Sequence, residues 1–193
     1  MLSKKEKNMF KKERIVLVLL FSIVVIYLSV HYGIKFLGIN GDNHPLIGKK
    51  APELTIKGID GTSEVKLSSF SGKKAIILDF WASWCGPCRQ ALPIMENLAK
   101  QYNPEQFSVI AVNVWDGNID QIKRFLSEKN IKTVNVFIET DKETNEKFMF
   151  SGVPAIFILD GDLNIKQFYR GYSPSLERAI KKTVEKLISE KNQ

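Results

Sequence analysis

Cysteine and histidine are both scarce in this chain of 193 residues, which contains two of each. His31 and His44 precede Cys85 and Cys88, and no histidine or cysteine follows Cys88. A structural zinc site needs four nitrogen or sulfur ligands at suitable spacings, and a copper-delivery site needs a histidine downstream of the thiols. The sequence therefore predicts no metal site.

So few cysteines also exclude a fold held together by several disulfides. A bridge between Cys85 and Cys88 closes a short loop, so it removes little entropy from the unfolded chain and adds little stability. This spacing favours a disulfide that opens and closes, with a nucleophilic thiolate and a resolving thiol within one helical turn. A purely structural disulfide stays open as the alternative.

The chain also lacks a signal-peptide cleavage site. Lys and Arg crowd residues 1–14, residues 15–34 are largely apolar, and no small-x-small pattern or lipoprotein cysteine follows. We therefore predict a basic cytoplasmic segment over 1–14, a transmembrane signal-anchor over 15–34, a linker over 35–45 and a globular domain over 46–193. The basic cluster should stay cytoplasmic, which places the domain outside the cell membrane. A cleaved signal peptide stays open.

Charge is unevenly distributed. Residues 1–40 hold seven Lys and Arg against two Asp and Glu, whereas the rest holds twenty-one against nineteen. The net charge of +7 is therefore mainly a topology signal. The globular part has no basic stripe interleaved with aromatic residues, which argues against a nucleic-acid partner.

The thiols follow a short apolar run, Ala75 to Phe80, which is typical of a strand buried on both faces. Asp79 lies inside this run, where an ionised carboxylate is costly and burial should raise its pKa. It is either a proton acceptor for the resolving thiol, or a carboxylate at an exposed strand end or beside Lys73 or Lys74. We favour the proton acceptor.

Residues 89–100 follow the thiols and have the spacing of an amphipathic helix. Pro87 suits its first turn, whereas Pro93 would remove a hydrogen bond and bend the axis. The amides and the positive dipole end at the helix start should lower the pKa of Cys85. Arg89 either adds a positive charge there or is simply a surface residue.

These residues resemble a known family. The stretch from Asp79 to Cys88, with Pro93 beyond it, resembles the thioredoxin superfamily, and the longer pattern resembles its membrane-anchored TlpA/ResA-like branch. Residues 48–54, 58–61 and 65–70 match upstream, and residues 152–160 resemble the cis-proline loop and the following strand. The resemblance covers about residues 46 to 190. It implies a thioredoxin-like α/β fold, with a mixed central sheet flanked by helices.

The resemblance also implies roles for individual residues. In the catalytic set, Cys85 is the nucleophile, Cys88 the buried resolving thiol and Asp79 the proton acceptor. The substrate-binding set is Trp84, Gly86, Pro87, Val153 and Pro154. A cis bond before Pro154 would let the backbone of Val153 pair with an extended substrate, although an ordinary trans proline stays open. No cofactor is expected beyond the redox-active disulfide.

The chain departs from the branch at two positions. Ala91 stands where a Glu is frequent, and Asp79 stands where Asn is frequent. One carboxylate can substitute for the other near the resolving thiol. The dithiol chemistry therefore carries over, but an inherited substrate such as apocytochrome c does not.

The remaining pattern predicts alternating strands and helices. Strands are expected over 107–114, 134–138, 155–159 and 165–169, the last two as a hairpin, and helices over 119–129, 143–150 and 175–189. Alternating elements that end in a hairpin favour an α/β class with a mixed sheet. About 150 residues suffice for a core without disulfide staples.

We therefore predict a membrane-tethered, extracytoplasmic thiol–disulfide oxidoreductase. It would act mainly as a reductase of disulfides in exported proteins, supplied with electrons by a DsbD/CcdA-type membrane donor. Three alternatives stay open: a disulfide oxidase, an isomerase, and a tethered peptide-binding or chaperone module with incidental redox activity. A peroxiredoxin is disfavoured, because residues 80–84 lack the proline that precedes a peroxidatic cysteine.

Overall fold

The computed structural model describes residues 17–29, 44–116 and 118–190. The chain divides into two compact units, residues 1–40 and 41–193, and each is considered by itself. In the first unit, residues 17–29 form a helix whose apolar side chains, Leu17 to Leu28, are largely exposed. No helix within the described residues is both long enough and apolar enough to cross a membrane. The predicted segments 1–14 and most of 35–45, and both ends of 15–34, lie outside the described residues.

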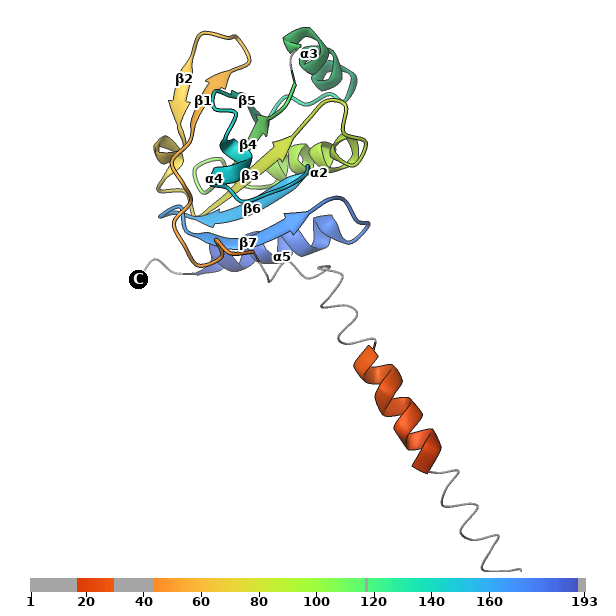
Figure 1. Ribbon diagram of the computed structural model, residues 1–193. Helices are drawn as coiled ribbons and strands as arrows, with labels where there is room; N and C mark the ends of the chain where they lie inside the picture. The colour runs from red at the N-terminus through yellow and green to blue at the C-terminus, as the bar shows by residue number, and fades with distance from the viewer. Residues whose placement is uncertain (1–16, 30–43, 117, 191–193) are drawn as a thin grey trace, which may run out of the picture. The chain divides into compact units, whose positions relative to one another are not determined.

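The second unit is built on a seven-stranded mixed sheet in the order β2-β1-β5-β4-β3-β6-β7 (Figure 1). The strands are β1 (Thr55–Gly58), β2 (Glu64–Lys66), β3 (Ala75–Trp81), β4 (Phe107–Asn113), β5 (Asn135–Glu139), β6 (Ala155–Asp160) and β7 (Ile165–Arg170). The pairs β3–β4 and β4–β5 are parallel, and the other pairs are antiparallel. This is the thioredoxin-like α/β architecture that the sequence predicts.

The helices are η1 (Leu67–Phe70, a 3-10 turn), α2 (Cys88–Gln101), α3 (Ile119–Glu128), α4 (Thr144–Lys147) and α5 (Leu176–Ser189). Three of them, α2, α3 and α5, fall close to their predicted ranges, whereas the sequence predicts no helix at η1. Helix α3 begins after Asn118, whose side chain accepts the amide hydrogens of Asp120 and Gln121. The predicted helix over 143–150 shortens to one turn, because Met149 adopts a left-handed conformation with φ of 54°.

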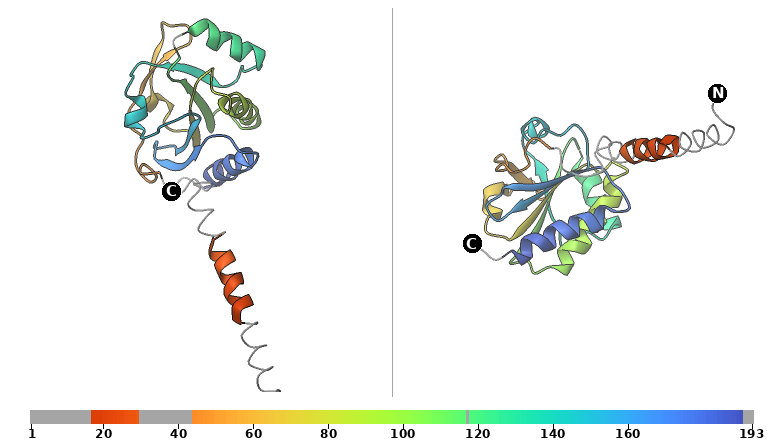
Figure 2. Two further views of the ribbon diagram at one scale, coloured as in Figure 1. Left: turned by 45° about the vertical axis from the view of Figure 1, so that its right-hand side comes forward. Right: turned by 90° about the horizontal axis from the view of Figure 1, so that it is seen from below.

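Two apolar clusters lie on the two faces of the sheet. One holds Ile77 and Trp81 of β3 together with apolar side chains from α2, α3 and α5. Figure 2 shows α2 and α5 side by side on this face. The other cluster holds the alternate β3 residues Ile76, Leu78 and Phe80, with Phe148 after α4. Strand β3 is thus buried on both faces, as its apolar run predicts.

Two parts of the domain differ from the sequence-based expectation. The sequence predicts no strand over residues 55–66, but β1 and β2 form an antiparallel hairpin that extends the sheet beyond β5. The domain also begins before residue 46, because His44 is 8% exposed and packs on Phe157 and Phe168. The last residues of the predicted linker therefore belong to the domain.

Candidate active site

A disulfide joins Cys85 and Cys88 where the chain passes from β3 into α2. The parallel strands β3, β4 and β5 run in the same direction, so all three end at the edge of the sheet where β3 leads to the disulfide (Figure 1). Ligand and catalytic sites of open α/β sheets commonly form at the carboxyl ends of such strands. The position of the disulfide therefore makes it the candidate active site.

Helix α2 directs its first amide group at the sulfur of Cys85. Cys88 is the first residue of the helix, and its backbone N–H donates to Cys85 Sγ at 3.1 Å. Pro87 occupies the position before it with φ of −60°, where its missing N–H costs no hydrogen bond. After reduction, the same amide and the helix dipole favour the thiolate form of Cys85.

The two sulfurs differ in accessibility. Cys88 is fully buried, whereas Cys85 retains 4% exposure. Its neighbour Trp84 is 58% exposed, and Gly86 and Pro87 are exposed as well. The exposed side of the disulfide is therefore that of Cys85, which an incoming substrate would meet first.

Asp79 is fully buried near the centre of β3. Strand alternation places its side chain on the same face as Ile77 and Trp81, the face whose cluster contains both cysteines. Neither carboxylate oxygen has a hydrogen-bond partner among the described residues. Burial therefore raises the pKa of Asp79 well above its usual range.

The structure excludes the two non-catalytic explanations for Asp79, an exposed strand end and a pair with Lys73 or Lys74. The side chain is not at an exposed strand end, because the whole of β3 is buried. Neither candidate lysine pairs with it: Lys73 Nζ donates to the carbonyl of Pro104, and Lys74 Nζ donates to that of Ile188. The carboxyl group is thus a buried titratable group that has no hydrogen-bond partner in the part of the chain that the structure describes.

The loop before β6 closes over the disulfide from the other side. The Val153–Pro154 peptide bond is cis, as the resemblance implied. The carbonyl oxygen of Val153 lies 3.5 Å from Cys85 Sγ. Pro154 is itself linked to β7 through its carbonyl, which accepts the amide hydrogen of Gly171. Val153 is half-buried and its backbone borders the reactive sulfur.

Two further positions within α2 bear on the chemistry. Ala91 is fully buried in the cluster that surrounds the cysteines, so no second carboxylate reaches them from this position. Pro93 lies inside the helix, which continues through it from Cys88 to Gln101. Asp79 is therefore the carboxyl group that β3 contributes to the sheet face covered by this cluster.

The structure adds residues around the site that the sequence analysis missed. Asp116 accepts hydrogen bonds from the backbone N–H of Ser83 (2.6 Å), the hydroxyl of Ser83 (3.2 Å) and the amide of Asn113 (2.7 Å). It thereby ties the loop that precedes the cysteines to the end of β4. No local pattern signals this link, because Ser83 and Asp116 are far apart in the sequence.

A second missed pair lies on the loop after β4. Trp115 has φ of 61°, and its N–H donates to Glu139 Oε1 at 2.8 Å. Glu139 Oε2 is buried without a partner among the described residues. Burial raises the pKa of Glu139, and the Trp115 amide opposes that rise. Glu139 thus holds an exposed tryptophan at the edge of the site.

Metal ligands are not assembled here. Within the residues that the structure describes, no group of three or more His, Cys, Asp or Glu side chains is placed to hold a metal ion. Arg89, which the sequence left as either functional or superficial, pairs with Glu128 at 3.6 Å and lies over the ring of Phe125 at 4.8 Å.

A buried disulfide at the start of α2, a cis-proline loop against it and a mixed sheet beneath it agree with the comparisons. The family model described as AhpC/TSA matches residues 47–168. The chain belongs to the AhpC/TSA family. Similar proteins include "Thiol-disulfide oxidoreductase ResA" of Bacillus subtilis, 25% identical over 169 residues, which cover 87% of this chain and 88% of that protein. The ResA of Bacillus thuringiensis subsp. konkukian is 29% identical over 138 residues, 70% of this chain and 78% of that protein.

A solved structure agrees with this assignment. A Chlorobium tepidum protein assigned as a thiol:disulfide interchange protein DsbE is 30% identical, with a TM-score of 0.64, and the match covers 74% of this chain and 98% of that chain. This member of the AhpC/TSA family is therefore a thiol–disulfide oxidoreductase with a thioredoxin-like fold, and its substrates are proteins that contain disulfides.

Proposed function

We propose that this oxidoreductase is tethered to the cell membrane, faces outward and reduces disulfides of exported proteins. The observation that carries the proposal is the Cys85–Cys88 disulfide, with a helix amide on one sulfur and a buried carboxyl group, Asp79, on the sheet face that the cluster with both cysteines covers. Neither oxygen of this carboxyl group has a hydrogen-bond partner among the described residues. In this proposal Cys85 is the nucleophile, Cys88 the resolving thiol and Asp79 the proton acceptor.

The first step is attack by the Cys85 thiolate on a sulfur of the substrate disulfide. A new S–S bond forms between Cys85 and the substrate, the substrate's own S–S bond breaks, and its second sulfur leaves as a thiolate. An extended substrate segment pairs with the backbone of Val153, whose carbonyl lies 3.5 Å from Cys85 Sγ. Trp84 and the Gly86-Pro87 turn offer further contact surface beside the sulfur.

The second step regenerates the protein disulfide. Asp79 accepts the proton of the Cys88 thiol, and the resulting thiolate attacks Cys85 Sγ. The Cys85–Cys88 bond forms, the S–S bond between Cys85 and the substrate breaks, and the substrate sulfur leaves as a thiolate, so both substrate sulfurs are now reduced. A carboxyl group with a raised pKa suits this task, because its affinity for a proton is closer to that of a thiol. The protein then needs two electrons, for which we propose a DsbD/CcdA-type membrane donor.

The proposed direction rests on the residues between the cysteines. Gly86 and Pro87 match thioredoxin, a reductant with a potential of about −270 mV, against about −120 mV for the oxidant DsbA. A measured Cys85–Cys88 potential near the DsbA value would contradict reduction and favour an oxidase or isomerase.

The proposed location rests on the first unit. Residues 17–29 form a helix with exposed apolar side chains, and Lys and Arg crowd the segment before it. Exposed apolar surface of this kind is typical of a segment that contacts lipid or another apolar partner. We expect the full chain to sediment with membranes and to resist extraction by carbonate. A domain that external protease digests in whole cells supports the orientation, and a domain protected until lysis contradicts it.

Two variants test the mechanism. Cys85→Ser should abolish reduction of a protein disulfide, because it removes the attacking sulfur. Cys88→Ser should accumulate mixed disulfides on Cys85, since the resolving step is lost. Trapping with Cys88→Ser in the native membrane, followed by identification of the captured proteins, also names the substrates. Full activity in either variant would contradict the mechanism, and peptide binding that persists in the double variant without any disulfide exchange would favour a chaperone.

A further inference from the structure

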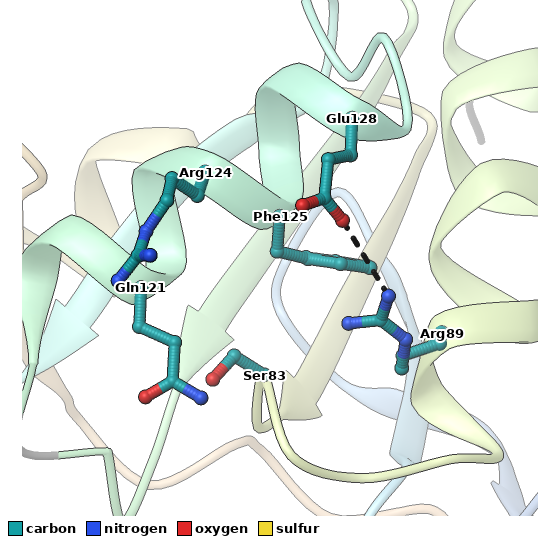
Figure 3. A pocket seen from close by; sticks show the side chains of 6 residues that line it. All are labelled: Ser83, Arg89, Gln121, Arg124, Phe125 and Glu128. Carbon is teal, nitrogen blue, oxygen red and sulfur yellow. Dashed lines mark ion pairs between the residues drawn. The ribbon is translucent and has the colours of Figure 1, made fainter.

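A polar pocket of about 270 Å³ lies beside the disulfide, between the start of α2 and one face of α3. It is lined by Ser83, Arg89, Gln121, Arg124, Phe125 and Glu128. Figure 3 shows Arg124 and Gln121 on one side of Ser83, and Arg89 with Glu128 on the other. Ser83 precedes Cys85 by two positions and Arg89 follows Cys88 directly, so residues that flank the disulfide in the chain line the pocket.

The two arginines of the pocket differ in their ion pairs. Arg89 pairs with Glu128 at 3.6 Å and covers the Phe125 ring at 4.8 Å, so its guanidinium group is held in place on both sides. Arg124 makes no ion pair with any described residue. Its Nε donates, at 3.5 Å, to the backbone carbonyl of Asp120 on its own helix. The remaining N–H groups of the Arg124 guanidinium are therefore available to a ligand.

The neighbouring groups define what such a ligand can be. Gln121 lies one turn before Arg124 on the same helix face and adds an amide donor. Two nearby acidic groups are already engaged: Glu128 pairs with Arg89, and Asp116 accepts three hydrogen bonds from Ser83 and Asn113. Asp120, one turn before Arg124, contacts it through its backbone carbonyl. A planar guanidinium with an adjacent amide fits a carboxylate, which accepts two parallel hydrogen bonds.

The size of the pocket distinguishes a side chain from a free small molecule. Its volume lies below the range of about 300–1,000 Å³ that encloses small-molecule ligands. It also opens to solvent, since the side chains of Arg89 and Glu128 are 41% and 61% exposed. An acidic side chain projecting from an extended polypeptide would fit this space without further burial of the chain.

We propose that this pocket binds an Asp or Glu side chain of the substrate polypeptide, close in sequence to the cysteine that Cys85 attacks. The inference rests on the proposed function, and it adds a sequence preference to it. The α-carbon of Ser83 lies within about 7.6 Å of that of Cys85, since consecutive α-carbons are 3.8 Å apart. An extended substrate advances about 3.3 Å per residue, so the acidic residue lies within about three positions of the cysteine.

The test uses the full chain, reduced beforehand and mixed with disulfide-bonded peptides in a single turnover. The peptides are identical except for Glu, Gln or Lys at one position within three residues of the cysteine. At the favoured position the Glu peptide should react about fivefold faster than the Gln peptide at low salt, as expected for a partly exposed ion pair. The advantage should shrink at high salt because screening weakens the pair.

Variants on α3 assign the effect to one side chain. Arg124→Gln should bring the Glu-to-Gln rate ratio close to one, and Arg124→Glu should make the Lys peptide faster than the Glu peptide. Lys123→Gln is the matched control: it removes the same charge from an exposed neighbour that does not line the pocket, and it should keep the wild-type ratio.

Three results would overturn the inference. Equal rates for Glu and Gln peptides at every position would show that the pocket reads no acidic residue. If the Glu peptide still reacts faster in Arg124→Gln, a group other than Arg124 binds the acidic side chain. Failure to reduce any of the peptides would contradict the proposed function itself, and this inference would fall with it.

Discussion

In the proposed mechanism, Asp79 places catalysis and stability in opposition at a single residue. The carboxyl group has no hydrogen-bond partner among the described residues and is fully buried, so its ionised form is costly in the folded state. A residue selected for packing at this position of β3 would be apolar like Ile77 and Leu78 beside it. We infer that the cost is retained because the resolving thiol needs a proton acceptor.

We predict that Asp79→Asn stabilises the protein while slowing it. The pKa of Asp79 is raised in the folded state, so between the usual carboxyl pKa and the raised value the folded state binds more protons than the unfolded state. Wild-type stability therefore falls as pH rises through this window, by at most about 1.4 kcal/mol per pH unit. Asn does not titrate, so the advantage of Asp79→Asn should grow from pH 4 to pH 8.

The measurements for this variant are thermal unfolding at several pH values and the lifetime of the mixed disulfide. The mixed disulfide should persist longer in Asp79→Asn, because Cys88 loses its proton acceptor. Asp162→Asn, at an exposed turn between β6 and β7, is the matched control and should change neither quantity. A stability gain that is independent of pH would contradict the assigned pKa direction.

Residue-level prediction from the sequence succeeds where the signal is local. Asp79 can be identified as a candidate site residue because it interrupts an apolar run, and the cysteines can be identified by their spacing. Glu139 and Asp116 could not be found in this way, since each acts on a backbone amide of a different segment, at Trp115 and Ser83. Such links exist only once β4, β5 and the loop before α2 have come together.

At the scale of elements, Glu96 ties α2 to the start of β5. Its carboxylate accepts the amide hydrogens of Thr133 (2.8 Å) and Val134 (3.1 Å), and it pairs with Lys100 Nζ at 3.0 Å. Burial alone would raise its pKa. The Lys100 ammonium and the two amides outweigh burial and hold the pKa of Glu96 at about 2.

We predict that Glu96→Gln lowers the free energy of unfolding at pH 7 by about 1–2 kcal/mol, because the amide side chain loses its charge and one acceptor oxygen. The wild-type pKa is depressed in the folded state, so this contribution is present above the unfolded value of about 4.3 and is lost as pH falls toward about 2. Urea unfolding at pH 7 and pH 2.5 should therefore show the two proteins converging.

Glu64→Gln is the control for this prediction. Glu64 pairs with Lys57 at 3.8 Å, and the two side chains are 60% and 41% exposed, so the loss should stay below about 0.5 kcal/mol. Equal effects of the two substitutions would contradict a specific role for Glu96 in holding α2 to β5.

Element prediction from the sequence works best for long periodic segments. Helices α2, α3 and α5 and strands β3 and β4 fall within one or two residues of their expected ranges. The hairpin of β1 and β2 is not predicted because its strands span only four and three residues, which is too short for their alternation to stand out, and β2 is mostly exposed. It forms because β1 pairs with β5, which lies about eighty residues later in the chain.

At the scale of the whole domain, the dependence of stability on pH sums groups that pull in opposite directions. The contribution of Asp79 makes the folded domain more stable at lower pH. His44 favours higher pH: burial lowers its pKa, and the charge of Arg170 adds to this, while the carbonyl of Met149 opposes it. Because Nδ1 accepts the amide hydrogen of Leu46 at 3.3 Å, the neutral ring carries its proton on Nε2, 3.2 Å from the Met149 carbonyl oxygen.

We predict that acidification from pH 7.5 to 5.5 weakens the domain through His44. The folded-state pKa of His44 lies below its unfolded value of about 6.5, so the unfolded chain binds more protons and stability falls as pH drops through that value. The Asp79→Asn background removes the opposing contribution and makes the slope measurable. In that background His44→Gln should flatten the slope, at the cost of stability at pH 7.5 from lost packing on Phe157 and Phe168.

His31→Gln removes the other histidine of the chain and is the natural comparison, made in the same Asp79→Asn background. It should keep the slope of unfolding free energy against pH that His44→Gln abolishes. If His44→Gln instead keeps the slope, the neutral ring that anchors the start of the domain is not the group responsible. In that case His44 stabilises the domain only through its packing against β6 and β7. The pH dependence of the unfolding free energy would then come from carboxyl groups.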